Sequence, residues 1–326
     1  MKTTVFGAGS VGGHMAGRLV MSGQDVNIVA RGAHLAAIQK SGLTLKIEDR
    51  THSCPVSATE KGETLGPQDL VIVAVKSNQL PAAVEGIRPL VGNSTHVLFL
   101  MNGLPAWFLQ GSELETPALR ALLDPEANIA RIVPAERTIW GVINSGGTIE
   151  APGIIRSTTP KNNVVKLGAP NDAQTDFIKT VAAILAKAGY ATEVSSNIRR
   201  DIWQKLTGVV GMAMTAAVLG WDNRATVADP ETRGVVIGCM KEMAAIGKAM
   251  GIEIPANFEA AMDPARIAPH RSSFLQDLEA GRPIELPSTI LAAREIARAA
   301  SVDAPHVSTI AALIGGRSRK AQALRS

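Results

Sequence analysis

Three glycines near the start of the chain have the spacing Gly-x-Gly-x-x-Gly, which is typical of phosphate-binding turns. Gly7 makes the tight turn, Gly9 lets the backbone approach a pyrophosphate, and Gly12 lets the following helix pack closely. The N-terminus of that helix offers N–H groups and a partial positive charge to the phosphates. A glycine-rich turn without a ligand is the alternative interpretation. The predicted cofactor-binding run is Gly7, Ala8, Gly9, Ser10, Val11 and Gly12.

The residues around this turn supply the elements that must position it. An apolar strand is predicted at 3–6, a helix at 14–22 and a second strand at 25–30. An NAD enzyme usually carries an acid at the end of the second strand, for the ribose 2′-hydroxyl. This chain has Arg31 there, and a guanidinium binds the 2′-phosphate that a carboxylate would repel. We therefore predict NADPH/NADP⁺ as the cofactor, with a solvated surface arginine as the alternative.

Two further polar residues follow predicted strands. Lys76 comes after the apolar run 70–75, and Asn102 comes after the strand predicted at 96–101. Ligands of open α/β sheets bind at the carboxyl ends of the strands, so both residues are candidate cofactor contacts. Taken alone, a solvated lysine and an ordinary Asn-Gly turn are equally good interpretations.

The order of elements predicts two domains. Strands and helices alternate through the first half, which is typical of a doubly wound, mostly parallel sheet. After about residue 195 the strand signals almost vanish, and Ala-, Met- and Leu-rich periodic segments take over. We predict an α/β Rossmann domain at 1–195 and an all-α domain at 196–326. The helices expected in the second domain are 198–219, 232–250, 271–280 and 288–300, and the basic tail with Arg317, Arg319, Lys320 and Arg325 is expected to fray.

These features together resemble the ketopantoate reductase (2-dehydropantoate 2-reductase) family over nearly the whole chain. Many Rossmann enzymes share the N-terminal marks, which are the glycine turn, Ala30-Arg31-Gly32, Val75-Lys76 and Met101-Asn102-Gly103. The specific marks are Ile202-Trp203-Gln204-Lys205-Leu206 and Ser272-Ser273-Phe274-Leu275-Gln276-Asp277, followed by Glu285. The resemblance implies an NADPH-dependent oxidoreductase that reduces ketopantoate to pantoate, a step of pantothenate biosynthesis.

The resemblance also implies roles for individual side chains. Lys205 matches the general acid, Glu285 the glutamate that holds the substrate C2 oxygen directly or through the cofactor ribose, and Ser273 the serine that binds the substrate carboxylate. Lys76 and Asn102 match cofactor contacts, and Asn102 is a candidate substrate contact as well. An ammonium suits the chemistry, because it stabilises the alkoxide left by hydride transfer and delivers a proton. Burial should lower its pKa. Without the resemblance, a surface lysine and a solvated acid would be the simpler interpretations.

The chain departs from the family pattern after Lys205. The family carries asparagines four and eight residues later, where this chain has Val209 and Ala213. Because neither side chain can hydrogen-bond a substrate, a reductase of a more apolar 2-oxo acid is the first alternative. A non-catalytic NADPH-binding sensor is the second. Asn223 matches a further substrate asparagine of the family.

Composition bounds the remaining possibilities. The 326 residues carry a net charge of +4, 3% aromatic residues, two distant cysteines and six histidines. Scarce aromatics argue against nucleic acid, the histidines lack metal-ligand spacing, and the apolar run 206–221 fits a buried helix better than a membrane span. The cysteine usage indicates a reducing compartment. We predict a cytoplasmic protein with a small anionic 2-oxo acid substrate, no metal, and a homodimer through the Ala- and Met-rich helices as an option.

Overall fold

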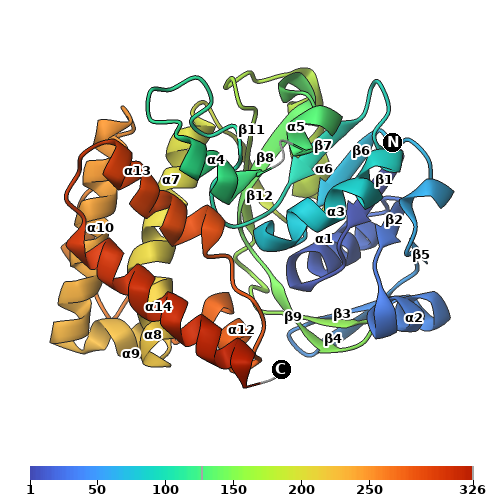
Figure 1. Ribbon diagram of the computed structural model, residues 1–326. Helices are drawn as coiled ribbons and strands as arrows, with labels where there is room; N and C mark the ends of the chain where they lie inside the picture. Colours follow the sequence, from blue (N-terminus) through green and yellow to red (C-terminus); the bar gives the residue numbers. More distant parts are fainter. Residues whose placement is uncertain (126–127, 325–326) are drawn as a thin grey trace. The chain divides into compact units, whose positions relative to one another are not determined.

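The computed structural model describes residues 1–125 and 128–324, which fall into two compact units (Figure 1). Unit 1 comprises Met1–Met101 and Ala127–Ile198, and unit 2 comprises Asn102–Glu126 and Arg199–Ser326. The border at Ile198 lies close to the predicted border at residue 195. The stretch that begins at Asn102 differs from our prediction, because it packs with the helical unit rather than with the sheet.

Unit 1 is built on an eight-stranded sheet whose neighbouring strands are parallel, except that β8 and β11 pair antiparallel. The predicted α/β class with a mostly parallel sheet is confirmed. β6 lies inside the sheet between β7 and β1, and all four of its residues are buried, as a fully apolar strand requires. In sheet order the strands are β12 (Ala191–Val194), β11 (Val164–Gly168), β8 (Thr138–Asn144), β7 (His96–Phe99), β6 (Leu70–Val73), β1 (Thr3–Phe6), β2 (Val26–Val29) and β5 (Ser57–Thr59).

A second, four-stranded sheet in unit 1 was not predicted. Its order is β4 (Arg50–Cys54), β3 (Leu43–Ile47), β10 (Ile154–Ser157) and β9 (Gly147–Ala151). Of the four strands between residues 138 and 168, only β8 and β11 join the main sheet, whereas β9 and β10 belong to the second one. The helix α1 packs on the second sheet, where Gly17 permits close approach, since a Cβ there would lie 3.0 Å from Leu45 Cδ2. The α-helices of unit 1 are α1 (Ser10–Met21), α2 (Gly32–Ser41), α3 (Leu80–Ile87), α5 (Asn128–Ile132) and α6 (Asp176–Lys187); its 3-10 turns are η1 (Gly62–Thr64), η2 (Ser77–Gln79), η3 (Arg88–Leu90) and η4 (Ala135–Arg137).

The described part of unit 2 is helical, as predicted, and contains no strand. Its last helix corrects the expectation of a frayed tail, since Arg317 donates to the Val218 carbonyl at 2.5 Å and Ile314 is fully buried. Arg319 and Lys320 also lie in that helix, whereas Arg325 lies outside the described residues. The helices are α4 (Pro117–Leu123), α7 (Ile198–Gly208), α8 (Met214–Leu219), α9 (Asn223–Ala228), α10 (Pro230–Ala249), α11 (Phe258–Ala261), α12 (Ser273–Glu279), α13 (Ala292–Ala299) and α14 (Pro305–Ala323).

Two π-turns lie among these helices: η5 (Val209–Ala213) lies between α7 and α8, and η6 (Pro287–Leu291), whose backbone is kinked at Thr289, directly precedes α13. The first joins α7 to α8 in one run, Ile198–Leu219, which confirms the predicted helix 198–219. Gly211 lets η5 approach α10, because a Cβ there would lie 2.5 Å from Met240 Cγ. Among the described residues this run is also the one helix long and apolar enough to cross a membrane, and 56% of its most apolar window is buried inside the protein.

The stretch that follows Asn102 is held on unit 2 by aromatic and polar contacts. The Phe108 ring stacks on Trp203 of α7 with centroids 6.1 Å apart, and Arg199 Nε donates to the Phe108 carbonyl at 3.0 Å. Further along, Thr116 Oγ1 donates to Glu295 Oε1 of α13 at 2.8 Å. These partners explain why the segment departs from the Rossmann sheet, and they are too distant in sequence to be read from strand alternation.

Candidate active site

The glycine turn in unit 1 is closed on one side and open on the other. Gly7 has φ +95°, and a Cβ there would lie 2.8 Å from Val75 Cγ1. A Cβ on Gly12 would overlap the Gly7 carbonyl oxygen, so α1 can approach the turn only without a side chain at that position. A Cβ on Gly9, in contrast, would meet no heavy atom within 4 Å. The close contacts at Gly7 and Gly12 are those expected of a tight turn packed against a helix, and the side at Gly9 is open for a ligand.

The N-terminus of α1 fits an anionic ligand. Gly9 is the N-cap residue, no side chain caps it, and the first turn contains no acidic residue. Ala8 is buried, Ser10 is exposed, and Val11 is half-buried. Uncapped N–H groups at the positive end of a twelve-residue helix are suited to a dinucleotide pyrophosphate.

Arg31 and Lys76 lie at the same edge of the sheet as the glycine turn. The order β6, β1, β2 places the residues after three adjacent parallel strands side by side, and these are Lys76, Gly7 and Arg31 in turn. Arg31 is the exposed N-cap of α2, while half-buried Lys76 precedes η2, two residues further from the end of its strand than predicted. The arrangement offers two cations to a phosphate-rich ligand at this edge.

His14, one turn into α1, belongs to a buried polar network rather than to an open site. Its Nε2 accepts from Arg18 Nε and lies 3.1 Å from Ser157 Oγ, while its Nδ1 lies 3.1 Å from the Tyr190 hydroxyl. Burial, and then the Arg18 guanidinium, lowers the pKa of His14 to about 3, which keeps the ring neutral. His14 therefore ties α1 to β10 of the four-stranded sheet, in line with a packing role.

Lys205 in unit 2 is carried by α7, which Trp203 anchors to α10. Trp203 is fully buried, and its Nε1 donates to the Met243 carbonyl of α10 at 2.9 Å. Two residues further along, a helix has turned about 200°, so Lys205 lies on another face than Trp203. Lys205 is half-buried, and Asp201, one turn earlier on the same face, is buried. Desolvation lowers the pKa of the Lys205 ammonium to about 8, as expected, and the Glu285 carboxylate opposes this shift.

Glu285 brings a second segment to Lys205, and Asn102 brings a third. Glu285 is 6% exposed, and Asn102 Nδ2 donates to its Oε2 at 3.2 Å. The turn before Glu285 is fixed by Asp277, whose carboxylate accepts from Arg282 Nε at 2.9 Å. Among the predicted residues, Lys205, Glu285 and Asn102 are thus brought together inside one unit.

The sequence did not reveal the groups that hold Asn102 in place. The Leu104 N–H donates to the Ser288 carbonyl of η6 at 2.6 Å, and Gly103 lies against Ser288. The Asn-Gly pair predicted only a turn, and no spacing relates it to a π-turn far along the chain.

Ser273 and Asn223 have contrasting surroundings. Ser273 is exposed at the first position of α12, while its neighbour Ser272 is buried, caps that helix and donates to the Ala213 carbonyl at 3.2 Å. Asn223 is 8% exposed, and its Oδ1 accepts no hydrogen bond from the described residues. An unpaired buried acceptor costs about 1–3 kcal/mol, which favours a ligand donor at this point.

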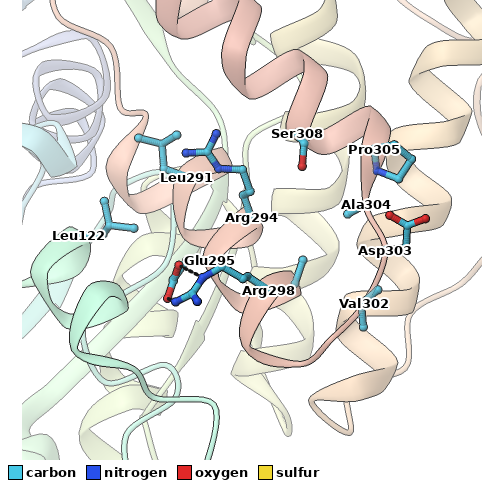
Figure 2. Close-up of a pocket in the computed structure, with 11 residues that line it drawn as sticks. Leu122, Leu291, Arg294, Glu295, Arg298, Val302, Asp303, Ala304, Pro305 and Ser308 are labelled. Carbon is cyan, nitrogen blue, oxygen red and sulfur yellow. Dashed lines mark hydrogen bonds and ion pairs between the residues drawn. The ribbon is translucent and has the colours of Figure 1, made fainter.

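Val209 and Ala213 open and close the π-turn η5, and both are half-buried. This turn contacts α9, the helix that begins with Asn223. A separate cavity of about 500 Å³ in unit 2 is lined by none of the predicted site residues; Arg294 and the Arg298–Glu295 ion pair lie on its wall (Figure 2). Within residues 1–125 and 128–324, no cluster of three or more His, Cys, Asp or Glu is arranged to hold a metal ion.

Comparison with known families identifies the family to which this chain belongs. The family model Ketopantoate reductase PanE/ApbA matches residues 3–172, and Ketopantoate reductase PanE/ApbA C terminal matches 197–318. The chain belongs to the ketopantoate reductase family. As a family member it is an oxidoreductase that acts on a CH–OH/C=O group, and a nicotinamide cofactor and a small 2-oxo acid substrate are implied.

Individual relatives cover nearly the whole length of this ketopantoate reductase family member. A 2-dehydropantoate 2-reductase of Mesorhizobium japonicum is 38% identical over 319 residues, which are 96% of this chain and 97% of the relative. The structure of a 2-dehydropantoate 2-reductase from Geobacter metallireducens has a TM-score of 0.85 at 26% identity, with 97% and 99% of the chains covered. A PanE/ApbA family ketopantoate reductase from Ralstonia eutropha has a TM-score of 0.82 at 25% identity, with 99% and 100% covered.

Proposed function

We propose that this protein reduces ketopantoate to pantoate with NADPH, and that Lys205 is the general acid. The observation that carries the proposal is the half-buried Lys205 ammonium beside the buried Glu285 carboxylate, which Asn102 holds by a hydrogen bond. A pKa of about 8 suits an acid that works near neutrality, because it is protonated there yet gives up its proton readily.

The roles of the side chains follow from their charges. When bound, NADPH supplies the hydride. The Lys205 ammonium stabilises the negative charge that develops on the C2 oxygen and transfers a proton to it. The Glu285 carboxylate raises the pKa of Lys205 against desolvation, so the acid stays charged at neutral pH. We assign the substrate carboxylate to the hydroxyl of exposed Ser273.

NADPH is proposed over NADH because of Arg31. Its guanidinium stands at the carboxyl end of β2, exposed, at the edge of the sheet that also carries the glycine turn. A guanidinium recognises a phosphate by charge-assisted hydrogen bonds, whereas the 2′-hydroxyl of NADH offers it no negative charge.

Asn223 favours ketopantoate among the 2-oxo acids. Its buried Oδ1 lacks a partner among the described residues and can only accept a hydrogen bond. The carboxylate and carbonyl of the substrate cannot donate, but the hydroxyl of ketopantoate can. We therefore assign the substrate hydroxyl to Asn223.

A reductase of a more apolar 2-oxo acid is the second candidate. Val209 and Ala213 favour it, since they present only hydrocarbon where the family has two asparagines. In this case the side chain of the substrate would carry no hydroxyl, and Asn223 would leave its Oδ1 unpaired.

The deciding experiment compares two substrates that differ by one hydroxyl. Ketopantoate and 3,3-dimethyl-2-oxobutanoate share a carbon skeleton, and NADPH oxidation is followed with each, with NADH in parallel. We expect kcat/KM to favour ketopantoate by about 10- to 100-fold, the cost of leaving a buried acceptor unpaired. Asn223→Leu, of similar volume, should erase the preference. A preference for 3,3-dimethyl-2-oxobutanoate, which lacks the hydroxyl, would support the second candidate. NADPH binding without turnover of either acid would indicate a non-catalytic sensor.

The proposed location is the cytoplasm. Both cysteines, Cys54 and Cys239, are buried free thiols, which fits a reducing compartment. The homodimer remains a prediction.

A further inference from the structure

We propose that Gly103 and the Ser288 carbonyl of the π-turn η6 are positioning groups, which hold Asn102 against Glu285 and thereby set the charge beside Lys205. The expected effect on catalysis rests on the proposed function, in which Lys205 is the general acid. The contacts that carry it lie wholly inside unit 2.

The π-turn makes the Ser288 carbonyl available. In a regular α-helix the Ala292 N–H would donate to Ser288 O, four residues earlier. Here the Ala292 N–H is directed to the carbonyls of Pro287 and Thr289 instead. The Ser288 carbonyl accepts from the Leu104 N–H at 2.6 Å, so the extra residue of the π-turn creates the docking point for the chain that follows Asn102.

Gly103 allows this docking at close range. Its φ is +89°, a conformation that residues with a Cβ rarely adopt. A Cβ on Gly103 would lie 2.6 Å from the Ser288 carbonyl oxygen and closer still to Ser288 Oγ. Any side chain at this position must therefore push the Asn102 segment away from η6.

The other end of the Asn102–Glu285 hydrogen bond is tied to the same π-turn. Thr289 has non-helical backbone angles, φ −114° and ψ −105°, and its Oγ1 donates to the Glu285 carbonyl. Thr289 is fully buried, so this contact is shielded from water. The turn thus holds the segment of Asn102 through Ser288 and the backbone of Glu285 through Thr289, and so it sets the spacing of the two backbone segments that carry these side chains.

Displacing Asn102 should change the pKa of Lys205. The Glu285 carboxylate raises the pKa of Lys205 against desolvation, and it can do so only while it stays close to the ammonium. A purely structural contact would affect the melting temperature without changing this pKa.

The test is Gly103→Ala with Gly111→Ala as the matched control. Gly111 lies in the same segment and has φ +79°, but a Cβ there would meet nothing within 4 Å. The control therefore places an alanine in a similar positive-φ backbone conformation, with a similar cost in folding free energy, but without the contact to Ser288. The primary measurement is the pH dependence of Lys205 acetylation by acetic anhydride, followed by peptide mass spectrometry, with melting temperature and NADPH affinity measured alongside.

We expect the apparent pKa of Lys205 to fall in Gly103→Ala and to stay at the wild-type value in Gly111→Ala. With the preferred 2-oxo acid, kcat should fall about 10- to 100-fold in Gly103→Ala, as a small displacement of a reacting group can cause. Gly103→Ala/Ser288→Gly removes the Ser288 side chain from the contact and should regain part of both losses.

An unchanged Lys205 pKa in a folded Gly103→Ala protein would overturn the inference, as would an equal change in Gly111→Ala. If Gly103→Ala does not fold, the double variant decides by the same labelling measurement against wild type. Because labelling needs no turnover, a wild-type protein inactive on every 2-oxo acid would refute the proposed function and leave the positioning test intact.

Discussion

The glycine turn of unit 1 and the Lys205 cluster of unit 2 are built on opposite principles. The turn presents backbone groups, and it requires residues without a side chain, because a Cβ on Gly7 would collide with Val75 and a Cβ on Gly12 would collide with the Gly7 carbonyl oxygen. The cluster presents side chains from three segments far apart in sequence: the Glu285 carboxylate acts on the Lys205 ammonium, and Asn102 is hydrogen-bonded to Glu285. A backbone site should tolerate changes of side chain nearby but no added Cβ, whereas a side-chain site should lose its chemistry with a single functional group.

The largest expected effect is the loss of kcat when the ammonium of the side-chain site is removed. Lys205→Met keeps a linear side chain but removes the ammonium, so kcat should fall about 10³-fold, the combined range for a general acid that also stabilises charge. NADPH affinity, measured by titration calorimetry, should stay near the wild-type value. Lys248→Met, on the exposed face of α10, is the control and should leave turnover unchanged. Near-normal kcat in Lys205→Met would refute the assignment.

The backbone site should be affected next. Gly12→Ala and Gly9→Ala add the same methyl group, the first into the Gly7 carbonyl and the second into open space. Overpacking typically costs about 1–3 kcal/mol, so Gly12→Ala should lower both the melting temperature and NADPH affinity, the latter about 10- to 100-fold. Gly9→Ala should weaken NADPH binding while leaving the melting temperature alone. Tight NADPH binding by Gly9→Ala would mean that the open side of the turn is not where the phosphates lie.

The smallest effect concerns the choice of cofactor. Removing one charge-assisted contact from an exposed guanidinium should cost about tenfold in NADPH affinity, since such bonds are worth about 1.5 kcal/mol at the low end. Arg31→Ala should therefore bind NADPH about tenfold more weakly and NADH as the wild type does. Arg50→Ala, an exposed arginine of the same unit, should change neither. Equal weakening for both cofactors would show that Arg31 does not read the 2′-phosphate.

The same contrast explains what the sequence could predict. The jobs of Gly7, Gly9 and Gly12 depend on neighbours within one strand–turn–helix, so a local pattern was sufficient, and the structure shows the expected turn. The all-apolar β6 and the long helix 198–219 were predicted for the same reason, although β6 ends two residues early.

Contacts between distant segments could not be predicted in this way. Lys205 and Glu285 were found through family resemblance, because nothing local distinguishes them from solvated charges. Asn102 was assigned to the Rossmann domain from its place after a strand, but Phe108 and Trp203 hold its segment on the helical unit. The second sheet depends on pairing β3 with β10 across about a hundred residues, and no propensity marks either π-turn.

The proposed reduction depends most on the proton that Lys205 carries. Lys205→Cys followed by 2-bromoethylamine rebuilds a lysine-like side chain with sulfur in the chain, which lowers the amine pKa, and the native Cys54 and Cys239 are buried away from the reagent. Wild-type kcat should be full at neutral pH and fall as the pH rises through about 8, because the ammonium is the active form. The alkylated variant should recover turnover, and its kcat should begin to fall at a lower pH than that of the wild type. Recovered turnover with the fall at the wild-type pH, or full activity before alkylation, would contradict the role of Lys205.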